Sequence, residues 1–333
     1  MIRLLRFGLS TLALAYLGAL VWYFTVLALE PGRTGWLGMA RELTLYAFLP
    51  LPVLLLAALL LLARTALVLT LPPLLLFAYF YGPQLLPRHP PEAAGPQLRV
   101  LSFNTGGNAG GGQAPPVLRA VQAVGADLVA LQEVPPVTVD ALRTALAAEY
   151  PYSAGDSEAL VLSRFPLQGL SGFQIPDGAY TSRQVEVQLG ARRLTLTNVH
   201  VNRPAYWLRW RGGVLPVVRG YDPTRRDAQV AELVRYAQRA AGPHLLVGDF
   251  NATEWSTAYE LLRAQFEDSF RAAGWGFGHT YPSHIVWGRW LVSVPLLRID
   301  YVFYSPELVA LRAYVGPDGG SDHLPVVAEL SFR

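Results

Sequence analysis

The chain of 333 residues contains no cysteine and no lysine, so all 27 of its basic residues are arginine. Without cysteine, it forms no disulfide and offers neither a thiol nucleophile nor a thiolate ligand for a metal ion. The glycine-rich stretch at residues 106–112 lacks the lysine and the spacing of a nucleotide-binding P-loop. Charged residues make up only 15% of the chain and hydrophobic residues 52%. This apolar excess lies before about residue 88 and indicates a specialised N-terminal part.

Three long N-terminal segments contain no Asp, Glu, Arg or His, namely residues 7–29, 43–63 and 65–87. A helix of about 20 residues can cross the hydrocarbon core of a bilayer, so we predict three transmembrane helices. The second and third form a tight hairpin around Arg64, and their prolines are expected to kink them. An uncleaved signal peptide and buried soluble helices are the alternatives, which three successive segments disfavour. Without ionisable groups in the spans, a transport pathway has no support.

We predict a transmembrane region over residues 1–87, a proline-rich tether over 88–97 and a catalytic domain over 98–333. The arginines are equally divided between the two sides of the membrane, but those before the first segment favour a cytoplasmic N-terminus. A multi-pass protein of the cell membrane, with its catalytic domain outside the cytoplasm, is therefore expected. Residues 98–333 contain 21 arginines and 21 acidic residues, unlike the strongly basic domain of a dedicated nucleic-acid binder.

Polar residues follow apolar runs at several points of the globular part. Residues 245–247 lead into Gly-Asp-Phe-Asn at 248–251, which predicts a buried strand that carries an acid and an amide at its C-terminal end. Asp can accept a proton or orient water, and Asn can donate to a phosphate oxygen. A turn capped by Asp and Asn is the structural alternative. Alternating strands and helices, followed by paired strands, predict a mixed α/β domain.

Seven motifs occur in order along this domain: Ser-Phe-Asn-Thr, Leu-Gln-Glu-Val, Leu-Ser-Arg-Phe-Pro, Asn-Val-His, Gly-Asp-Phe-Asn, Arg-Ile-Asp-Tyr-Val and Ser-Asp-His-Leu-Pro-Val. Each motif alone has a structural explanation, such as capping a turn, but it is improbable that such explanations account for all seven motifs in this order. The series resembles that of the endonuclease/exonuclease/phosphatase superfamily, which has the DNase I-like fold, over residues 98–333. The resemblance implies a four-layer α/β sandwich, in which helices flank two packed mixed β-sheets and the site lies at one edge of the sheets.

The resemblance also implies a metal site. Glu133 would be the main Mg²⁺ ligand, with Asn104 beside it and Asp322 supporting the metal side; Mn²⁺ is an alternative ion. Mg²⁺ prefers oxygen ligands and keeps several waters, so one or two protein oxygens suffice. Phosphoryl transfer needs charge neutralisation and an aligned water more than it needs a covalent nucleophile. The residue types therefore agree with the implied chemistry.

The implied catalytic residues are Asp249, Asn251, His200, Asp300 and His323. Asp249 would orient or deprotonate the attacking water, and Asn251 would hold a phosphate oxygen. His323, oriented by Asp300, would contact the phosphate or act as a base. His200 would bind phosphate or protonate the leaving group.

Two aromatic segments between the motifs bear on the substrate. Residues 203–226 contain six arginines and four Tyr or Trp residues, and residues 274–297 contain five aromatic residues. Contact with nucleic acid, contact with lipid head groups and simple packing of bulky loops all remain open, and the tether and the neutral domain favour lipid. Arg203 and Arg226 are candidate substrate-binding residues. Arg226 and Gln229 also match a recurrent helix feature of the family, which we interpret mainly as structural support.

The leading hypothesis is a membrane-anchored, Mg²⁺-dependent phosphohydrolase that cleaves a lipid-linked phosphate or pyrophosphate by metal-assisted attack of water. Three spans before such a domain resemble the arrangement in VanJ-type teicoplanin-resistance proteins, which are linked to undecaprenyl pyrophosphate. A membrane-tethered nuclease or phosphodiesterase acting on DNA or RNA is the alternative. A non-catalytic binding protein on the same fold is a third hypothesis, which the intact motif set disfavours.

Overall fold

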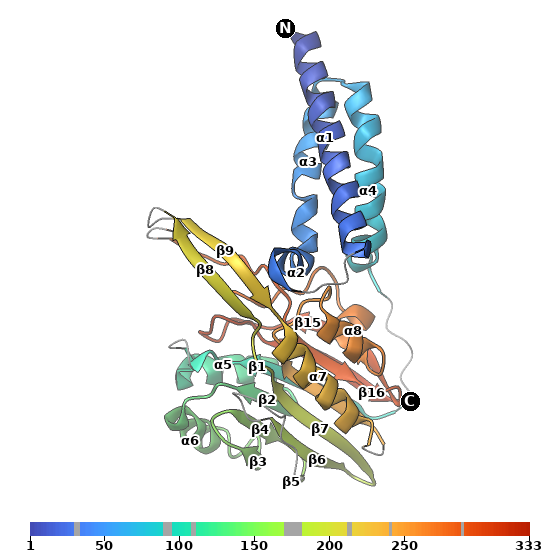
Figure 1. Cartoon of the computed structure of the whole chain (residues 1–333). Coiled ribbons are helices and arrows are strands. Elements are labelled where there is room, and N and C mark those ends of the chain that lie inside the picture. The colour runs from blue at the N-terminus through green and yellow to red at the C-terminus, as the bar shows by residue number, and fades with distance from the viewer. Residues whose placement is uncertain are drawn as a thin grey trace. The chain divides into compact units, whose positions relative to one another are not determined.

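The computed structural model describes residues 1–29, 34–88, 95–107, 111–169, 182–211, 215–239, 242–287 and 290–333. Most of the predicted tether, residues 89–94, lies outside the described residues. The chain divides into two compact units (Figure 1). The first unit comprises Met1–Leu86 with Ala205–Pro223, and the second comprises Pro87–Pro204 with Thr224–Arg333. Residues 205–223 are therefore grouped with the apolar N-terminal part, although the sequence places them within the predicted catalytic domain of residues 98–333.

Two six-stranded mixed β-sheets form the centre of the second unit. The first sheet has the order β15 (Leu308–Val315), β16 (Val326–Phe332), β1 (Gln97–Asn104), β2 (Leu128–Gln132), β4 (Ala159–Ser163) and β3 (Tyr152–Gly155). The second has the order β11 (Glu267–Asp268), β14 (Asp300–Tyr304), β10 (His244–Asp249), β7 (Arg192–His200), β6 (Arg183–Leu189) and β5 (Leu167–Gly169). The pairs β1–β2 and β7–β10 are parallel, and the other neighbours are antiparallel.

Side chains alternate along β1 between two apolar cores. Leu98 and Val100 belong to the core between the two sheets, whereas Leu101 and Phe103 belong to a second core on the outer face. Helices α5 (Ala114–Val124) and α6 (Pro136–Ala145) complete this outer core, because the apolar face of each helix needs a partner surface.

The second sheet repeats the pattern. In β10, Leu245 and Val247 lie in the core between the sheets, while Leu246 packs on the outer face with helices α7 (Thr224–Ala237) and α8 (Thr257–Arg263). Helix α9 (Ser269–Ala273) and the short pair β12 (Ile285–Trp287) and β13 (Trp290–Val292) complete the unit. The prediction of two packed mixed sheets flanked by helices is confirmed.

Apolar helices make up most of the first unit. Helices α1 (Ile2–Leu29) and α4 (Arg64–Leu85) are long and apolar enough to cross a membrane. The predicted second span, residues 43–63, contains the 3₁₀ helix η1 (Thr44–Phe48) and α3 (Pro50–Leu60). It is preceded by α2 (Gly35–Glu42), and the chain bends by 75° between α2 and Thr44–Leu60. Pro50 stands at the start of α3, where its missing N–H would have no partner within the helix in any case. The described residues thus provide two candidate spans, or up to three if the bent pair crosses as one.

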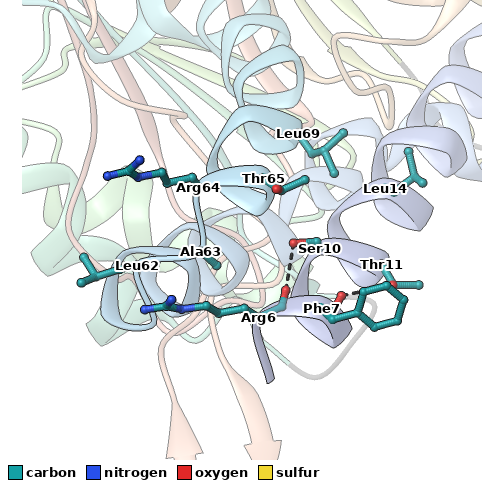
Figure 2. A pocket seen from close by; sticks show the side chains of 10 residues that line it. All are labelled: Arg6, Phe7, Ser10, Thr11, Leu14, Leu62, Ala63, Arg64, Thr65 and Leu69. Atoms are coloured by element: carbon teal, nitrogen blue, oxygen red, sulfur yellow. Dashed lines mark hydrogen bonds between the residues drawn. The ribbon is translucent and has the colours of Figure 1, made fainter. Parts of the chain in front are cut away.

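Small residues bring these helices together. Ala13 of α1, Ala58 of α3 and Ala66 of α4 are fully buried in one cluster, which allows close approach of the backbones. Arg6 donates from Nε to the carbonyl of Leu61 at 2.7 Å, between the start of α1 and the short α3–α4 connection. A cavity of about 730 Å³ opens at this end of the helices, with residues of α1 on one side and the start of α4 on the other (Figure 2).

Strands β8 (Ala205–Arg211) and β9 (Leu215–Asp222) form a separate antiparallel hairpin within the first unit. Tyr221 Oη donates to Glu42 Oε1 at 2.7 Å and so connects β9 with the end of α2. The arginine-rich segment predicted to bear on the substrate is therefore largely a β-hairpin that is grouped with the apolar helices.

Candidate active site

The predicted site residues continue the rows of side chains that face the core between the sheets. Asn104 lies on the same face of β1 as Val100, and Asp249 lies on the same face of β10 as Val247. In the second sheet, Asp249 is paired with His200 of β7 on one side and with Asp300 of β14 on the other. The strand ends therefore bring polar groups together where the apolar core stops.

Asp249 is the centre of this arrangement and is only 1% exposed. Its Oδ2 accepts hydrogen bonds from Asn104 Nδ2 at 3.0 Å and from Asn251 Nδ2 at 3.3 Å, while Oδ1 accepts from the Asn251 backbone N–H at 2.8 Å. The Nε2 atoms of His200 and His323 lie 3.7 and 3.8 Å from the same Oδ2. Burial raises the pKa of Asp249, and the nearby Asp300 carboxylate raises it further. Asp249 is therefore a carboxylate that can take up a proton more readily than an exposed one.

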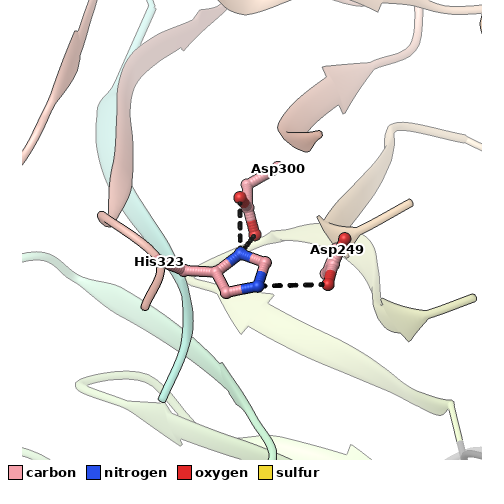
Figure 3. Close-up of side chains that lie close together, drawn as sticks. All are labelled: Asp249, Asp300 and His323. Carbon is pink, nitrogen blue, oxygen red and sulfur yellow. Dashed lines mark hydrogen bonds and ion pairs between the residues drawn. The ribbon is translucent and has the colours of Figure 1, made fainter. Parts of the chain in front are cut away.

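His323 is held between two carboxylates. Its Nδ1 lies 3.0 Å from Asp300 Oδ2, and its Nε2 faces Asp249 on the other side of the ring (Figure 3). Thr280 Oγ1 donates to Asp300 Oδ2 at 2.6 Å, and the ring of Tyr281 packs on the imidazole with 4.8 Å between centroids. Burial lowers the pKa of His323, but the two carboxylates outweigh this effect and raise the pKa above its ordinary value. His323 is thus held in its charged form.

His200 has the opposite character. Its Nε2 lies 3.4 Å from Glu133 Oε1 and its side chain is almost completely buried. Burial lowers the pKa of His200 to about 3, and the positive charges of His323 and Arg203 act in the same direction. The exposed Arg203 is thus close enough to influence the site electrostatically. One histidine is charged and the other neutral at neutral pH, a separation typical of acid–base sites.

The predicted metal ligands lie around the ends of β1 and β2. Asn104 Nδ2 is 3.3 Å from Glu133 Oε1, and the Glu133 side chain is 12% exposed. Asp322 lies against the chain that follows Asn104, because a Cβ atom added to Gly106 would be only 2.6 Å from Asp322 Oδ1. Glu133 and Asp249 approach the same two groups, Asn104 Nδ2 and His200 Nε2. This collection of oxygen donors fits a hard divalent cation.

A second group of potential ligand atoms comprises Asp249, Asp300 and His323, whose atoms lie within 4.8 Å of one another. It differs from the predicted ligand set. Because the Nδ1 of His323 and the Oδ2 of Asp300 bond to each other, and Thr280 also bonds to Asp300, these groups already have partners. We therefore interpret the group as a hydrogen-bonded relay beside the predicted metal ligands.

Backbone geometry sets two of the site residues apart. Glu133 has φ 51° and Asn251 has φ 49°. These left-handed values cost a residue such as Glu about 1–2 kcal/mol, whereas Asn adopts them more readily. Glu133 directly follows the end of β2, and Asn251 lies two positions after the end of β10. Strain of this kind is concentrated at functional sites.

Arg226 is buried and holds the backbone of a site residue in place. Its side chain is 1% exposed, Nη1 donates to the carbonyl of Asn251 at 3.0 Å and Nε donates to Asp227 Oδ1 at 2.8 Å. One turn later in α7, Gln229 Oε1 accepts the backbone N–H of Asn202 at 3.0 Å. The two residues hold the segments that follow β10 and β7.

Sequence reasoning did not single out Thr280 and Tyr281, which lie in the second aromatic segment. Two further residues, Ser321 and Gln132, lie within the seven sequence motifs but have no predicted catalytic or ligand role. Ser321 Oγ donates to the carbonyl of Asn104 at 2.8 Å and accepts the His323 backbone N–H at 3.0 Å. Gln132 Nε2 donates to Asn198 Oδ1 at 2.6 Å and links the two sheets beneath the site. Their presence in the motifs was the available signal.

The sequence model of the Endonuclease/Exonuclease/phosphatase family matches residues 101–323. The crystal structure of an endonuclease/exonuclease/phosphatase from Bacteroides vulgatus superimposes with a TM-score of 0.53 and 18% identity, over 72% of this chain and 100% of that chain. TDP2 from D. rerio, complexed with a single-strand DNA product, gives a TM-score of 0.53 and 16% identity, over 71% of this chain and 99% of that chain. At these identities the likeness concerns the fold. A search of curated proteins gives no significant match.

Proposed function

The chain belongs to the endonuclease/exonuclease/phosphatase family, and from this premise we propose that it is a membrane-anchored, Mg²⁺-dependent phosphohydrolase. Members of this family are phosphoesterases and nucleases, and they usually use a divalent metal ion. The proposed reaction is cleavage of a phosphoester or pyrophosphate bond by water. The observation that carries the proposal is the convergence of Asn104, His200 and His323 on the buried carboxylate of Asp249.

Each residue has a chemical task in this proposal. Asp249 orients the attacking water and accepts its proton, because burial favours the protonated form of this carboxyl group. The charged imidazole of His323 binds a phosphate oxygen, and Asp300 keeps it charged and oriented. His200, neutral because its pKa is lowered, fits hydrogen bonding to phosphate better than protonation of a leaving group. Asn251 and Arg203 complete the phosphate side.

Glu133, Asn104 and Asp322 would hold the metal ion, and Mn²⁺ would suit the same oxygen ligands as Mg²⁺. A divalent ion bound there would supply charge neutralisation for the phosphate group under attack. Arg226 takes no part in substrate contact in this proposal, because its buried guanidinium is bonded to Asn251 and Asp227.

A lipid-linked phosphate or pyrophosphate is the proposed substrate, with the catalytic unit on the outer side of the cell membrane. Support comes from the apolar helices and from the resemblance of this arrangement to VanJ-type proteins. The alternative is a tethered nuclease or phosphodiesterase, which the arginine content of residues 203–226 favours.

The deciding experiment uses purified full-length protein with Mg²⁺, with undecaprenyl pyrophosphate in one assay and plasmid DNA in the other. His323→Ala should lower kcat about 100-fold or more, as expected for loss of a positioned charge that stabilises the phosphate group in the transition state. His244→Ala is the matched control, because His244 is buried at the opposite end of strand β10. Phosphate release that is lost only in His323→Ala supports the lipid phosphatase. Plasmid nicking with the same dependence supports the nuclease, and equal activity of both variants contradicts the assignment of the site.

A further inference from the structure

The hairpin β8–β9 is a separate two-stranded sheet. Among the described residues, its two strands pair only with each other. A two-stranded hairpin is at best marginally stable in water, and a further surface stabilises it. Tyr206 and Trp207 leave large aromatic side chains 53% and 55% exposed on it. These features indicate that the hairpin lies against a partner surface.

The end of β9 contacts α2, and α2 in turn contacts Trp22 and Tyr23 in the C-terminal part of α1. Tyr221 of β9 donates to Glu42 at the end of α2. Trp36 of α2 stacks on Trp22 of α1, with 6.2 Å between ring centroids and 10° between planes, and Tyr23 donates to a carbonyl of α2 at 2.8 Å. Trp and Tyr favour the boundary between bilayer and water. The hairpin therefore begins at the level where α1 would leave the membrane.

The charge of the hairpin specifies the partner. Residues 205–222 contain three arginines and one acidic residue, Asp222, at the last position of β9. Arg219 is exposed and lies at the register shift opposite Trp207 and Leu208, where a β-bulge twists the ribbon. The indole of Trp207 lies directly against Gly220, where an added Cβ would be 2.6 Å from the ring. Exposed arginine beside exposed Trp is typical of segments that bind anionic lipid surfaces.

We propose that the hairpin β8–β9 lies on the membrane surface and binds the phosphate groups of anionic phospholipids. Its connection to the end of α1 favours a bilayer over single-stranded nucleic acid, which similar side chains can also bind. Only four residues, 201–204, separate His200 at the end of β7 from the start of the hairpin, so a lipid-contacting element closely follows a site residue along the chain. The inference does not depend on which phosphate ester the site cleaves.

The absence of cysteine makes a direct test practical, because one introduced cysteine can carry a nitroxide label in the full-length protein. Trp207→Cys and Tyr206→Cys report on the hairpin. Asp140→Cys, exposed on α6, is the aqueous reference, and Leu14→Cys in α1 is the membrane reference. Each protein is reconstituted into vesicles of phosphatidylcholine with or without phosphatidylglycerol. Collisions of the label with oxygen and with a water-soluble nickel chelate are then compared.

We expect the ratio of oxygen to nickel collisions at the hairpin to lie between the two references and to rise when phosphatidylglycerol is present. Arg219→Glu should remove this rise, and Tyr206→Cys provides the answer if Trp207→Cys fails to reconstitute. A hairpin ratio equal to that of Asp140→Cys in both kinds of vesicle overturns the proposal. Immobilisation of the label by a single-stranded oligonucleotide, without a response to phosphatidylglycerol, overturns it in favour of nucleic-acid binding.

Discussion

At the scale of single residues, the two histidines of the site owe their different charges to their neighbours. Both are almost fully buried, and burial alone would lower the pKa of each. The Nδ1 of His323 lies 3.0 Å from Asp300 and its Nε2 faces Asp249, and these two carboxylates outweigh the effect of burial on its pKa, so His323 is held in its charged form. Thr280 in turn orients Asp300, and its role follows from a contact between residues 20 positions apart in the sequence.

Replacing this threonine tests whether the contact matters for catalysis. Thr280→Val removes the hydroxyl donor, and we expect kcat to fall about tenfold with little change in KM. A hydrogen bond to a charged group contributes about 1.5–3 kcal/mol, and 1.36 kcal/mol corresponds to a factor of ten. Thr280→Ser keeps the hydroxyl and should stay close to wild type in the same steady-state assay. Equal kcat values for the Val and Ser variants would show that the hydrogen bond has no positioning role.

At the scale of elements, the close approach of strands β7 and β10 sets the distance between His200 and Asp249, which face each other in register. Gly248 permits this approach. Its φ is 144°, and an added Cβ would lie 1.8 Å from the carbonyl oxygen of Val199. The motif Gly-Asp-Phe-Asn therefore requires glycine at position 248 for steric reasons, whereas its Asp and Asn have proposed chemical roles.

Gly248→Ala should displace β10 from β7, lower kcat/KM strongly and destabilise the protein by about 1–3 kcal/mol through overpacking. Gly190→Ala is the control, because Gly190 also has a positive φ, 64°, but no atom lies within 4 Å of an added Cβ. The control should retain kcat/KM and lose about 1–2 kcal/mol of stability through backbone strain alone. Thermal denaturation in detergent and the activity assay measure the two effects. Full activity of Gly248→Ala would contradict the steric argument.

At the scale of the whole molecule, a buried ion pair connects separate elements of the second unit. Asp268 accepts two hydrogen bonds from Arg298, at 3.0 and 2.6 Å, and one from Tyr259 at 2.8 Å. It also caps helix α9 by accepting from the backbone N–H of Phe270 at 2.9 Å. Burial alone would raise the pKa of Asp268, but Arg298 outweighs burial and the pKa falls to about 2.

This pKa predicts a loss of stability in acid. Because the pKa of Asp268 is lower in the folded protein than the roughly 3.9 of an unfolded chain, the charged carboxylate stabilises the fold above about pH 4. That contribution is lost as the pH falls towards 2. Asp268→Asn should lower the free energy of unfolding at pH 7 by about 1.5–3 kcal/mol, since it removes charged hydrogen bonds from the buried Arg298, which keeps Glu254 as its other carboxylate partner. Melting curves at several pH values measure both effects.

The exposed Asp140 provides the comparison, and Asp140→Asn should keep the wild-type melting profile at every pH. Asp268→Asn should also lose less of its remaining stability between about pH 4 and pH 2 than wild type does. If the acid dependence of the melting temperature were the same with and without this carboxyl group, Asp268 would not be the group responsible.

The sequence by itself determined the class of the second unit and most of the residues that meet at its site. Alternating apolar positions dictate which face of each strand is buried, and the motif residues at the strand ends lie on the same face as the core between the sheets. Their order along the chain carried the family resemblance, which the family match over residues 101–323 supports. Such features are local, because they depend on neighbours only a few residues away.

Only the tertiary structure decided the features that depend on distant contacts. The charge of His323 depends on the carboxylates of Asp249 in β10 and Asp300 in β14. No local sequence pattern predicts the hydrogen bond from Thr280 to Asp300. The apolar run at residues 43–63, which composition alone describes as continuous, folds as a 3₁₀ helix followed by α3. The arginine-rich hairpin belongs with the apolar helices because Tyr221 reaches Glu42, 179 positions earlier in the chain. Composition records which side chains are available, whereas packing determines which of them meet.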